Sequence, residues 1–370
     1  MQKLGDYIKE YSVRNRFNED IPVYSVTNSQ GFCRDYFGKE VASGNKKTYK
    51  IVPRHAFAYN PSRINVGSVD YQHCEDKVIV SPLYNVFTVN ENIIPEYLYY
   101  YLKSPSTIKR IKTVASGSVR NNLKLSMLCE FPIEVPSISK QKKILNIMRE
   151  IRFSIDCRKN ELEQLDNLIK ARFVEMFEEK NIDEDTIDNV ASFCSRGKSP
   201  KYVSESKLKV VNQACIYWDK LKFENVKYNE ETYDGDRILS HNDLLICSTG
   251  TGTLGRCNIF RSPDDSRYMA DSHVTIVRLN DRVLPEVFKV WFERPRTQEK
   301  LYSDCVSGST NQIELSKEKL KTMSIPVPPI EQQNQFAIFV AQVDKSKFAI
   351  QKSLEKTQQL FDSLMQEYFG

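Results

Sequence analysis

Two long stretches of the chain place apolar residues at alternating spacings of four and three, with polar residues between them. This period, kept over more than about four heptads, is typical of helices that pair as a coiled coil. The predicted seam consists of Ile144, Met148, Ile151, Ile155, Leu162, Leu165, Ile169 and Met176 in the first stretch and of Phe336, Val340, Val343, Ile350, Leu354, Phe361, Leu364 and Tyr368 in the second. We expect two helices of about 33 residues, each about 50 Å long.

Polar residues interrupt both seams, at Arg158 and Arg172 in the first helix and at Lys347 and Thr357 in the second. One alternative is that each apolar stripe packs on the core of its own globular domain instead of on the other helix. The polar runs "RKNELEQ" and "QKSLEKTQQ" favour exposed, rod-like helices.

The rest of the chain mixes strand and helix patterns. The runs "KVIVSPLYNVFTV", "NDLLICS" and "SHVTIVRL" are rich in β-branched residues and predict strands. The segments "PEYLYYYLKS" and "PEVFKVWFERP" predict helices that begin with proline, which is favoured at the first helical position. These patterns predict an α+β fold with globular α/β domains and two long helices.

The second half of the chain repeats the first. "VNENIIPEYLYYYLKSP" from Val89 matches "LNDRVLPEVFKVWFERP" from Leu279, and the Ser-Gly-Ser at Ser116 returns at Ser307. The offset between matching blocks drifts only from 190 to 192 residues, so we predict two copies of one unit. The expected boundaries are 1–140 for the first globular domain, 141–179 for the first long helix, 180–328 for the second globular domain and 329–370 for the second long helix.

The composition is compatible with several classes of function. The chain has 53 Lys and Arg against 48 Asp and Glu, an excess that permits nucleic-acid binding without requiring it. The basic excess lies in the globular parts, with 19 basic and 13 acidic residues in 1–140 and 21 and 19 in 186–325. Nine Cys without a C-x-x-C pair, four His without metal-ligand spacing, and no long apolar run or signal peptide predict a cytoplasmic protein with free thiols and no membrane contact.

The stretch "STGTGTLGRC" contains Gly250-x-Gly252-x-x-Gly255 after an apolar run, the pattern of a dinucleotide-binding loop. Such a loop needs a helix directly after it to receive the pyrophosphate, and turn residues follow instead. The repeat aligns this loop with "YNPSRINVGS" (59–68), which keeps only the apolar-Gly step at Gly67. We therefore expect a turn at Gly67 and Gly255 and no bound cofactor.

No other motif predicts catalysis. "SRGKSP" is like the end of a Walker A loop, but Ser192 stands where the first glycine belongs and Pro200 blocks the helix. Acidic residues are scattered without an evident acid–base pair. We expect no metal site and no catalytic residues.

Several loops carry side chains that suit nucleic acid, because Arg and Lys match guanine and phosphate while Asn and Gln match adenine. The alternative for each residue is an ordinary solvated loop position, but such residues recur at equivalent places in both copies. The candidate DNA contacts are Tyr59, Asn60, Arg63, Asn65, Ser118, Arg120 and Asn121 in the first copy and Arg196, Lys198, Lys201, Tyr202, Thr249, Thr251, Thr253, Arg256, Thr310, Asn311 and Gln312 in the second.

The order and duplication of these blocks resemble the specificity subunits of type I restriction-modification systems. The supporting blocks are "YNPSRINVGS", the two Ser-Gly-Ser segments, "IEVPSISKQKKIL" and "IPVPPIEQQNQF", so the resemblance covers nearly the whole chain. It implies a non-catalytic subunit whose two target recognition domains each read one half of a bipartite DNA site. It also implies that the long helices form an antiparallel coiled coil that sets the distance between the half-sites. Two methyltransferase subunits would dock on the helices and recognition domains, and restriction subunits would join them.

Two other functions are compatible with parts of this pattern. A coiled-coil adaptor would join protein partners without reading DNA, and its binding would lack the salt dependence of phosphate contacts. A nucleotide-dependent enzyme would be stabilised against unfolding by its nucleotide.

Overall fold

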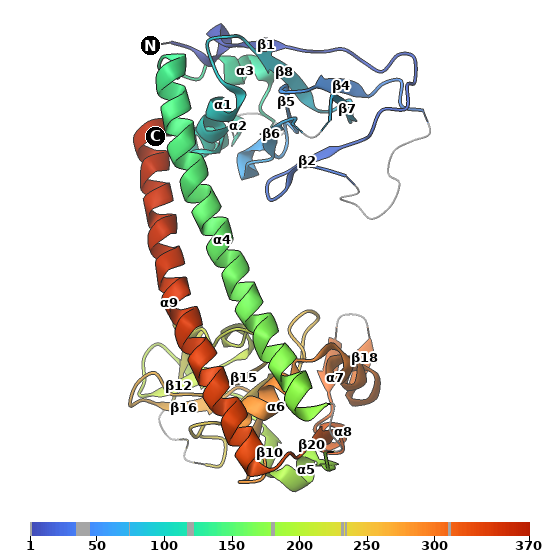
Figure 1. Cartoon of the computed structure of the whole chain (residues 1–370), viewed down its shortest axis with the longest axis vertical. Coiled ribbons are helices and arrows are strands. Elements are labelled where there is room, and N and C mark those ends of the chain that lie inside the picture. The colour runs from blue at the N-terminus through green and yellow to red at the C-terminus, as the bar shows by residue number, and fades with distance from the viewer. Residues whose placement is uncertain are drawn as a thin grey trace. The chain divides into compact units, whose positions relative to one another are not determined.

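The computed structural model describes residues 2–34, 45–73, 75–116, 122–178, 182–230, 233, 235–309 and 312–370. The chain divides into two compact units. The first unit comprises Met1–Lys159 and Lys352–Gly370, and the second comprises Asn160–Gln351. Each unit therefore contains a globular part and one half of each long helix, α4 (Ile138–Phe177) and α9 (Ile330–Phe369) (Figure 1).

The first unit is built on a four-stranded antiparallel sheet in the order β1-β8-β5-β6. In its core the rings of Phe57 and Phe87 stack with centroids 4.9 Å apart. Two smaller strand pairs, β2 with β3 and β4 with β7, enclose a separate small core. The elements are η1 (Leu4–Asp6), β1 (Ile8–Glu10), β2 (Ser25–Thr27), β3 (Gly31–Cys33), β4 (Lys50–Pro53), β5 (Phe57–Tyr59), η2 (Ile64–Val66), β6 (Val69–Tyr71), β7 (Lys77–Val80), β8 (Asn85–Val89), α1 (Pro95–Lys103), α2 (Pro105–Ser116) and α3 (Leu125–Cys129).

The second unit has an equivalent sheet in the order β10-β17-β14-β15, also antiparallel. A further sheet, β11-β13-β12-β16, contains one parallel pair, β12 with β16. The elements are β9 (Glu184–Thr186), α5 (Ile187–Val190), β10 (Ala191–Arg196), β11 (Tyr202–Val203), β12 (Leu208–Val211), η3 (Gln213–Cys215), η4 (Phe223–Asn225), β13 (Lys227–Asn229), β14 (Leu244–Cys247), β15 (Cys257–Ile259), β16 (Arg267–Ala270), β17 (Val274–Leu279), α6 (Pro285–Phe292), α7 (Pro295–Lys300), η5 (Leu301–Cys305), β18 (Val306–Ser309), β19 (Gln312–Leu315), α8 (Lys317–Lys321) and β20 (Ser324–Pro326).

The predicted duplication is confirmed by the matching sheets. The hairpin of β5 and β6 corresponds to that of β14 and β15, and α1 corresponds to α6, each with proline in its first turn. The predicted strands at 77–89, 242–248 and 272–279 are present as β7 with β8, β14 and β17.

One glutamine near the start of each long helix forms hydrogen bonds to the adjoining globular part. The buried Gln141 accepts a hydrogen bond from the Ile94 N–H at 2.9 Å and donates to the Asn92 and Pro136 carbonyls. Gln333, equally buried, accepts from the Leu284 N–H at 2.8 Å and donates to the Arg282 and Pro328 carbonyls. The Pro- and Gln-bearing segments noted in the sequence thus make the same three bonds in both units.

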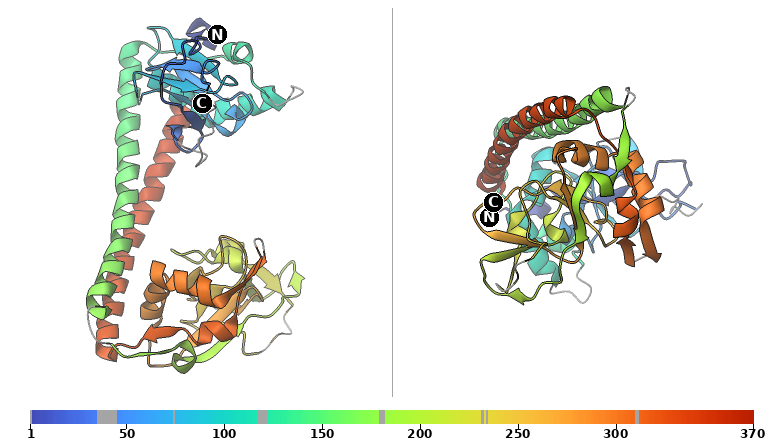
Figure 2. Two further views of the ribbon diagram at one scale, coloured as in Figure 1. Left: turned by 90° about the vertical axis from the view of Figure 1, so that its right-hand side faces the viewer. Right: turned by 90° about the horizontal axis from the view of Figure 1, so that it is seen from below.

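The long helices run antiparallel in each unit, where they lie side by side (Figure 2). In the first unit, Arg152 lies over the Phe361 ring and Arg158 Nε donates to Ser353 Oγ at 2.9 Å. In the second unit, Lys347 Nζ donates to Asp166 Oδ1 at 2.5 Å, and Arg172 lies over the Phe339 ring. Residues later in α4 therefore contact residues earlier in α9, which is the order expected of antiparallel helices.

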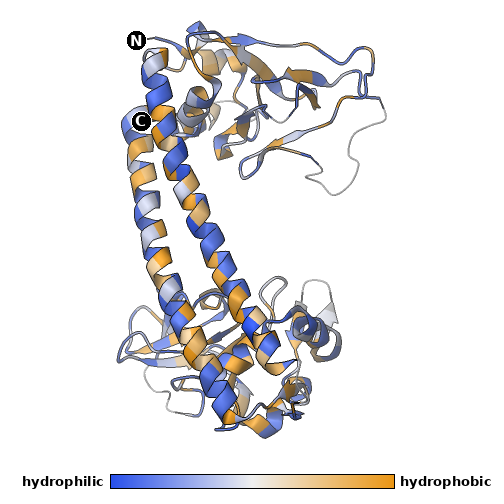
Figure 3. Ribbon diagram, in the orientation of Figure 1, coloured by the Kyte–Doolittle hydropathy of each residue, from blue (hydrophilic) through white to orange (hydrophobic). Residues whose placement is uncertain are grey.

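The predicted seam positions are all buried or half-buried, and Figure 3 shows apolar residues recurring along both helices. The fully buried positions, such as Ile155 and Phe336, join the cores of the globular parts as well as the other helix. Helix pairing and packing on the domain core therefore both occur, although the sequence presents them as alternatives. The seam interruptions have a role in pairing, because Arg158 and Lys347 bond across to the other helix. Each helix has 40 residues, more than the 33 expected.

Candidate nucleic-acid interface

The glycine-rich loop of the second unit connects two antiparallel strands, β14 and β15. Gly250, Gly252 and Gly255 have φ angles of +91°, +86° and +85°, a left-handed conformation that favours glycine. Gly67 in the first unit has φ +88° at the equivalent place. The expected turn at both positions is confirmed, and a strand follows the loop where a dinucleotide site would need a helix.

The first unit brings its candidate loop against the segment that begins at Asn122. Ser62 Oγ donates to Asn122 Oδ1 at 2.7 Å, and the Leu123 N–H donates to the Pro61 carbonyl. Arg63 is exposed, and Asn60 and Asn65 are half-buried. Ser118, Arg120 and Asn121 lie outside the described residues.

Tyr59 does not belong to this surface. Its side chain is 0 % exposed, its hydroxyl donates to the Leu123 carbonyl and accepts from Asn85 Nδ2, and burial raises its pKa. The prediction of a DNA contact here was wrong, because an aromatic residue at the end of a buried strand fills the core.

In the second unit, Arg196 and the Ser-Gly-Ser hairpin come together. Arg196 pairs with Glu314 and donates through Nη2 to the Leu315 carbonyl at 2.7 Å. A hollow of about 440 Å³ lies there, and Ser195, Arg196, Gly197, Arg237, Ser307, Glu314, Leu315, Ser316 and Lys317 line it. Gln312 begins strand β19, and Thr310 and Asn311 lie outside the described residues.

The glycine-rich loop joins the same surface. The Leu315 N–H donates to the Ser248 carbonyl at 2.8 Å, and Thr249 forms a β-bridge with Glu314. Arg256 folds back over the loop, because Nη2 donates to the Gly252 carbonyl at 2.8 Å and the guanidinium lies over the Tyr217 ring. Thr251 is exposed at the tip of the loop.

The remaining candidates of the second unit lie on β11 and just before it. Lys198 lies 4.4 Å from the centroid of the Tyr233 ring, and Lys201 is exposed with its ammonium 3.5 Å from Glu230. The Tyr202 hydroxyl donates to Asp271 Oδ2 at 2.9 Å. Burial and the neighbouring Asp271 raise the pKa of Tyr202 to about 12, so its hydroxyl stays protonated.

Two further polar residues, His273 and Gln213, lie on this surface although no sequence motif indicates them. His273 Nδ1 lies 3.1 Å from Thr249 Oγ1, and Gln213 Oε1 lies 3.4 Å from the same hydroxyl. The Thr253 hydroxyl donates to the Thr249 carbonyl at 2.8 Å. The sequence could have indicated His273, since His273 and Thr249 flank the buried strands β17 and β14, which pair with each other. It could not have indicated Gln213, which contacts Thr249 from 36 residues away in the chain.

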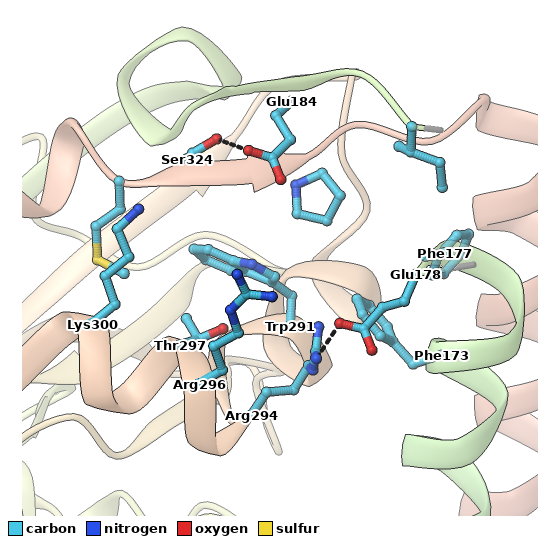
Figure 4. Close-up of a pocket in the computed structure, with 13 residues that line it drawn as sticks. Phe173, Phe177, Glu178, Glu184, Trp291, Arg294, Arg296, Thr297, Lys300 and Ser324 are labelled. Atoms are coloured by element: carbon cyan, nitrogen blue, oxygen red, sulfur yellow. Dashed lines mark hydrogen bonds and ion pairs between the residues drawn. The ribbon is translucent and has the colours of Figure 1, made fainter. Parts of the chain in front are cut away.

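A separate cavity of about 330 Å³ lies in the second unit between the end of α4, α7 and β20 (Figure 4). Its carboxylates are engaged, since Glu178 pairs with Arg294 and Glu184 accepts from Ser324 Oγ at 2.5 Å. Arg296, Thr297 and Lys300 line the opposite wall. Both acidic groups of this cavity therefore have a partner among the residues that line it.

The described cysteines are free thiols, and several of them are buried. Burial raises the pKa of Cys247 to about 12 and that of Cys215 to about 11. Such thiols stay protonated and are poor nucleophiles. Among the described residues, no cluster of His, Cys, Asp or Glu has metal-ligand geometry, and no helix is long and apolar enough to span a membrane.

Comparison with known proteins gives consistent matches. The sequence profile described as type I restriction modification DNA specificity domain matches residues 4–167 and again 180–360. The type I restriction enzyme EcoKI specificity subunit of Escherichia coli (strain K12) is 20% identical over 95% of this chain and 80% of its own length. The StySPI specificity subunit of Salmonella potsdam is 20% identical over 97% of this chain and 83% of its own length.

Solved structures share the fold. A chain from a type I R-M system, studied for its complex assembly and conformational transition, has a TM-score of 0.58 at 16% identity and covers 99% of this chain and 96% of its own length. The S subunit of a type I restriction-modification system from M. genitalium has a TM-score of 0.55 at 14% identity, over 100% of this chain and 95% of its own.

Proposed function

Since this chain belongs to the family of type I restriction modification DNA specificity domains, we propose that its two units each read one half of a bipartite, asymmetric DNA site. The observation that carries the proposal is that equivalent sheets present different polar loops. Arg63 and Asn60 lie on the loop of the first unit, whereas Thr249 and Thr251 lie on that of the second. One chain with two similar but non-identical readers suits an asymmetric site in two parts.

We further propose that the subunit is non-catalytic and binds no cofactor of its own. Methyl transfer and DNA cleavage would belong to partner subunits, with two methyltransferase subunits docked on α4, α9 and the globular parts. A solved chain of the same fold was studied for complex assembly in a type I R-M system, and this likeness supports partners of this kind. Acting on DNA within such a complex, the protein would work in the cytoplasm.

Co-expression with the neighbouring methyltransferase subunit tests the proposal. Sequencing the methylated bases should yield a motif of two different halves separated by a spacer of fixed length. Methylation that is absent, or that does not depend on this subunit, would contradict the proposal.

DNA affinity against salt distinguishes the proposed reader from a protein adaptor. Phosphate contacts predict that log affinity falls with log salt by about 0.9 per neutralised phosphate, because bound counterions are released. A coiled-coil adaptor would show no such slope.

A further inference from the structure

Two side chains of the second unit converge on one hydroxyl group. His273 Nδ1 lies 3.1 Å from Thr249 Oγ1, and Gln213 Oε1 lies 3.4 Å from that oxygen. A threonine hydroxyl has a single proton. Gln213 Oε1 can only accept. Both contacts are therefore satisfied together in the tautomer that carries the proton on His273 Nδ1, with Thr249 donating to Gln213 and accepting from His273.

This arrangement leaves two polar atoms of opposite character. With the proton on Nδ1, His273 Nε2 carries a lone pair and accepts, whereas Gln213 Nε2 donates. Neither atom has a hydrogen-bond partner among the described residues. His273 is exposed and Gln213 is half-buried, so both groups reach the surface.

The backbone around these side chains is held in place. Asp271 Oδ1 accepts from the His273 N–H at 2.8 Å, and its other oxygen accepts from the Tyr202 hydroxyl. The Ser248 N–H donates to the His273 carbonyl at 2.8 Å, which ties the glycine-rich loop to the same turn. A donor and an acceptor in fixed positions can discriminate between base edges, because a wrong edge leaves them unpaired.

We propose that Gln213 and His273 together read one base pair of the second half-site through its major-groove edge. Adenine presents an acceptor, N7, beside a donor, the N6 amino group. Gln213 Nε2 would donate to N7 and His273 Nε2 would accept from N6. Guanine offers two acceptors there and cannot satisfy His273. This inference rests on the proposed function, and Thr249 acts in it as a positioning residue.

The first unit does not carry the same reader. The cross-strand pairs Tyr59 with Asn85 and Cys247 with Val274 align the two sheets. By that alignment, Pro61 and Tyr84 hold the places of Thr249 and His273. Proline has no hydroxyl and Tyr84 is buried, so the donor–acceptor pair belongs to one half-site alone.

The test uses the complex with the methyltransferase subunit and a DNA library randomised over both half-sites. Gln213→Ala and His273→Ala should each weaken the preference for adenine about 5- to 150-fold, at one and the same position of one half-site. Thr249→Val should weaken it at that position too, by a smaller factor. His241→Ala is the matched control, because His241 is also exposed but precedes β14, at the opposite end of that strand from Thr249.

The outcomes separate this inference from the proposed function. Unchanged preferences in the Gln213 and His273 variants, with a bipartite motif for the unaltered complex, would overturn only the assignment of the reader. Equal loss at both half-sites in a variant whose melting temperature is unchanged would also overturn it, since the two residues would then not read one half-site alone. An unaltered complex without any bipartite motif would overturn both proposals.

Discussion

Asp243 is a fully buried carboxylate directly before β14, at the opposite end of that strand from Thr249. Arg278 on β17 binds it through two bonds, Nε to Oδ1 and Nη2 to Oδ2, each 2.7 Å long. The hydrogen bonds to Asp243 raise the pKa of Arg278 further above its ordinary value. Two charges in this geometry stabilise each other, but removing one leaves the other buried without its counterion.

Arg278→Ala should lower the free energy of unfolding by about 3 kcal/mol, because the Asp243 carboxylate would keep the Ser240 N–H as a donor but lose its ion pair. Urea unfolding measures the change. Lys201→Ala is the control, since Lys201 and its partner Glu230 form an exposed ion pair whose loss should cost under about 1 kcal/mol. Equal effects of both substitutions would contradict this account.

The glycines of the loop differ in what surrounds them. A Cβ on Gly255 would lie 2.5 Å from Gln298 Oε1 and 3.2 Å from Leu301 Cδ2, whereas one on Gly252 would meet nothing within 4 Å. Gly252→Ala should therefore cost only the backbone strain of about 1 kcal/mol, and Gly255→Ala about 2–3 kcal/mol. Thermal unfolding of the two variants compares them directly, and a larger loss for Gly252→Ala would refute the steric explanation.

For individual residues, the sequence predicted backbone conformation better than side-chain contacts. The turn at Gly255 followed from the missing helix and from the repeat, both of which can be recognised from the order of residues alone. Tyr59 was misassigned because a tyrosine suits a core as well as a DNA surface. Gln213 was overlooked because its neighbours, Thr249 and His273, are far from it in the chain.

Among the elements, the two long helices were the most predictable. The period of the apolar residues predicts which face of each helix is buried, but not which partner covers it. One pattern therefore predicted both the pairing of the helices and the burial of Ile155 and Phe336. The helices have 40 residues because they begin before the predicted seams, at Ile138 and Ile330. Gln141 and Gln333 lie within these first turns and are bonded to the globular parts. Periodicity alone could not place those ends, since the residues there are polar.

Gln141→Ala and Gln333→Ala should each lower the free energy of unfolding by about 2–4 kcal/mol. Each substitution removes three hydrogen bonds and leaves the N–H of Ile94 or Leu284 without its acceptor. Because the two sites are equivalent, the two losses should agree within about 1 kcal/mol. Gln335→Ala, an exposed position on α9, provides the control in urea unfolding, and a loss as large there would argue against a specific role for the buried pair.

For the whole molecule, the duplication explains why one chain can carry two readers. Equivalent sheets, equivalent helices and equivalent glutamine bonds repeat, while the strand pairs outside the common sheet differ, with β4 and β7 antiparallel and β12 and β16 parallel. Repetition was visible in the sequence because the blocks at helix starts and turns are constrained by backbone geometry. The divergent strands were not predictable in detail, since their packing depends on contacts that no local pattern encodes.

The paired helices would set the spacing between the two half-sites, which a matched deletion can test. Removing residues 156–162 and 350–356 takes one heptad from each helix, and the bond between Arg158 and Ser353 shows that these segments face each other. A heptad is two helical turns, so the seam stays in phase while each helix shortens by about 10 Å. At about 3.4 Å per base pair, the spacer in the methylated motif should shorten by about three base pairs. Lys159→Ala with Lys352→Ala keeps the helix length and should leave the spacer unchanged. If the deletion variant folds and methylates the original spacing, the helices do not determine it.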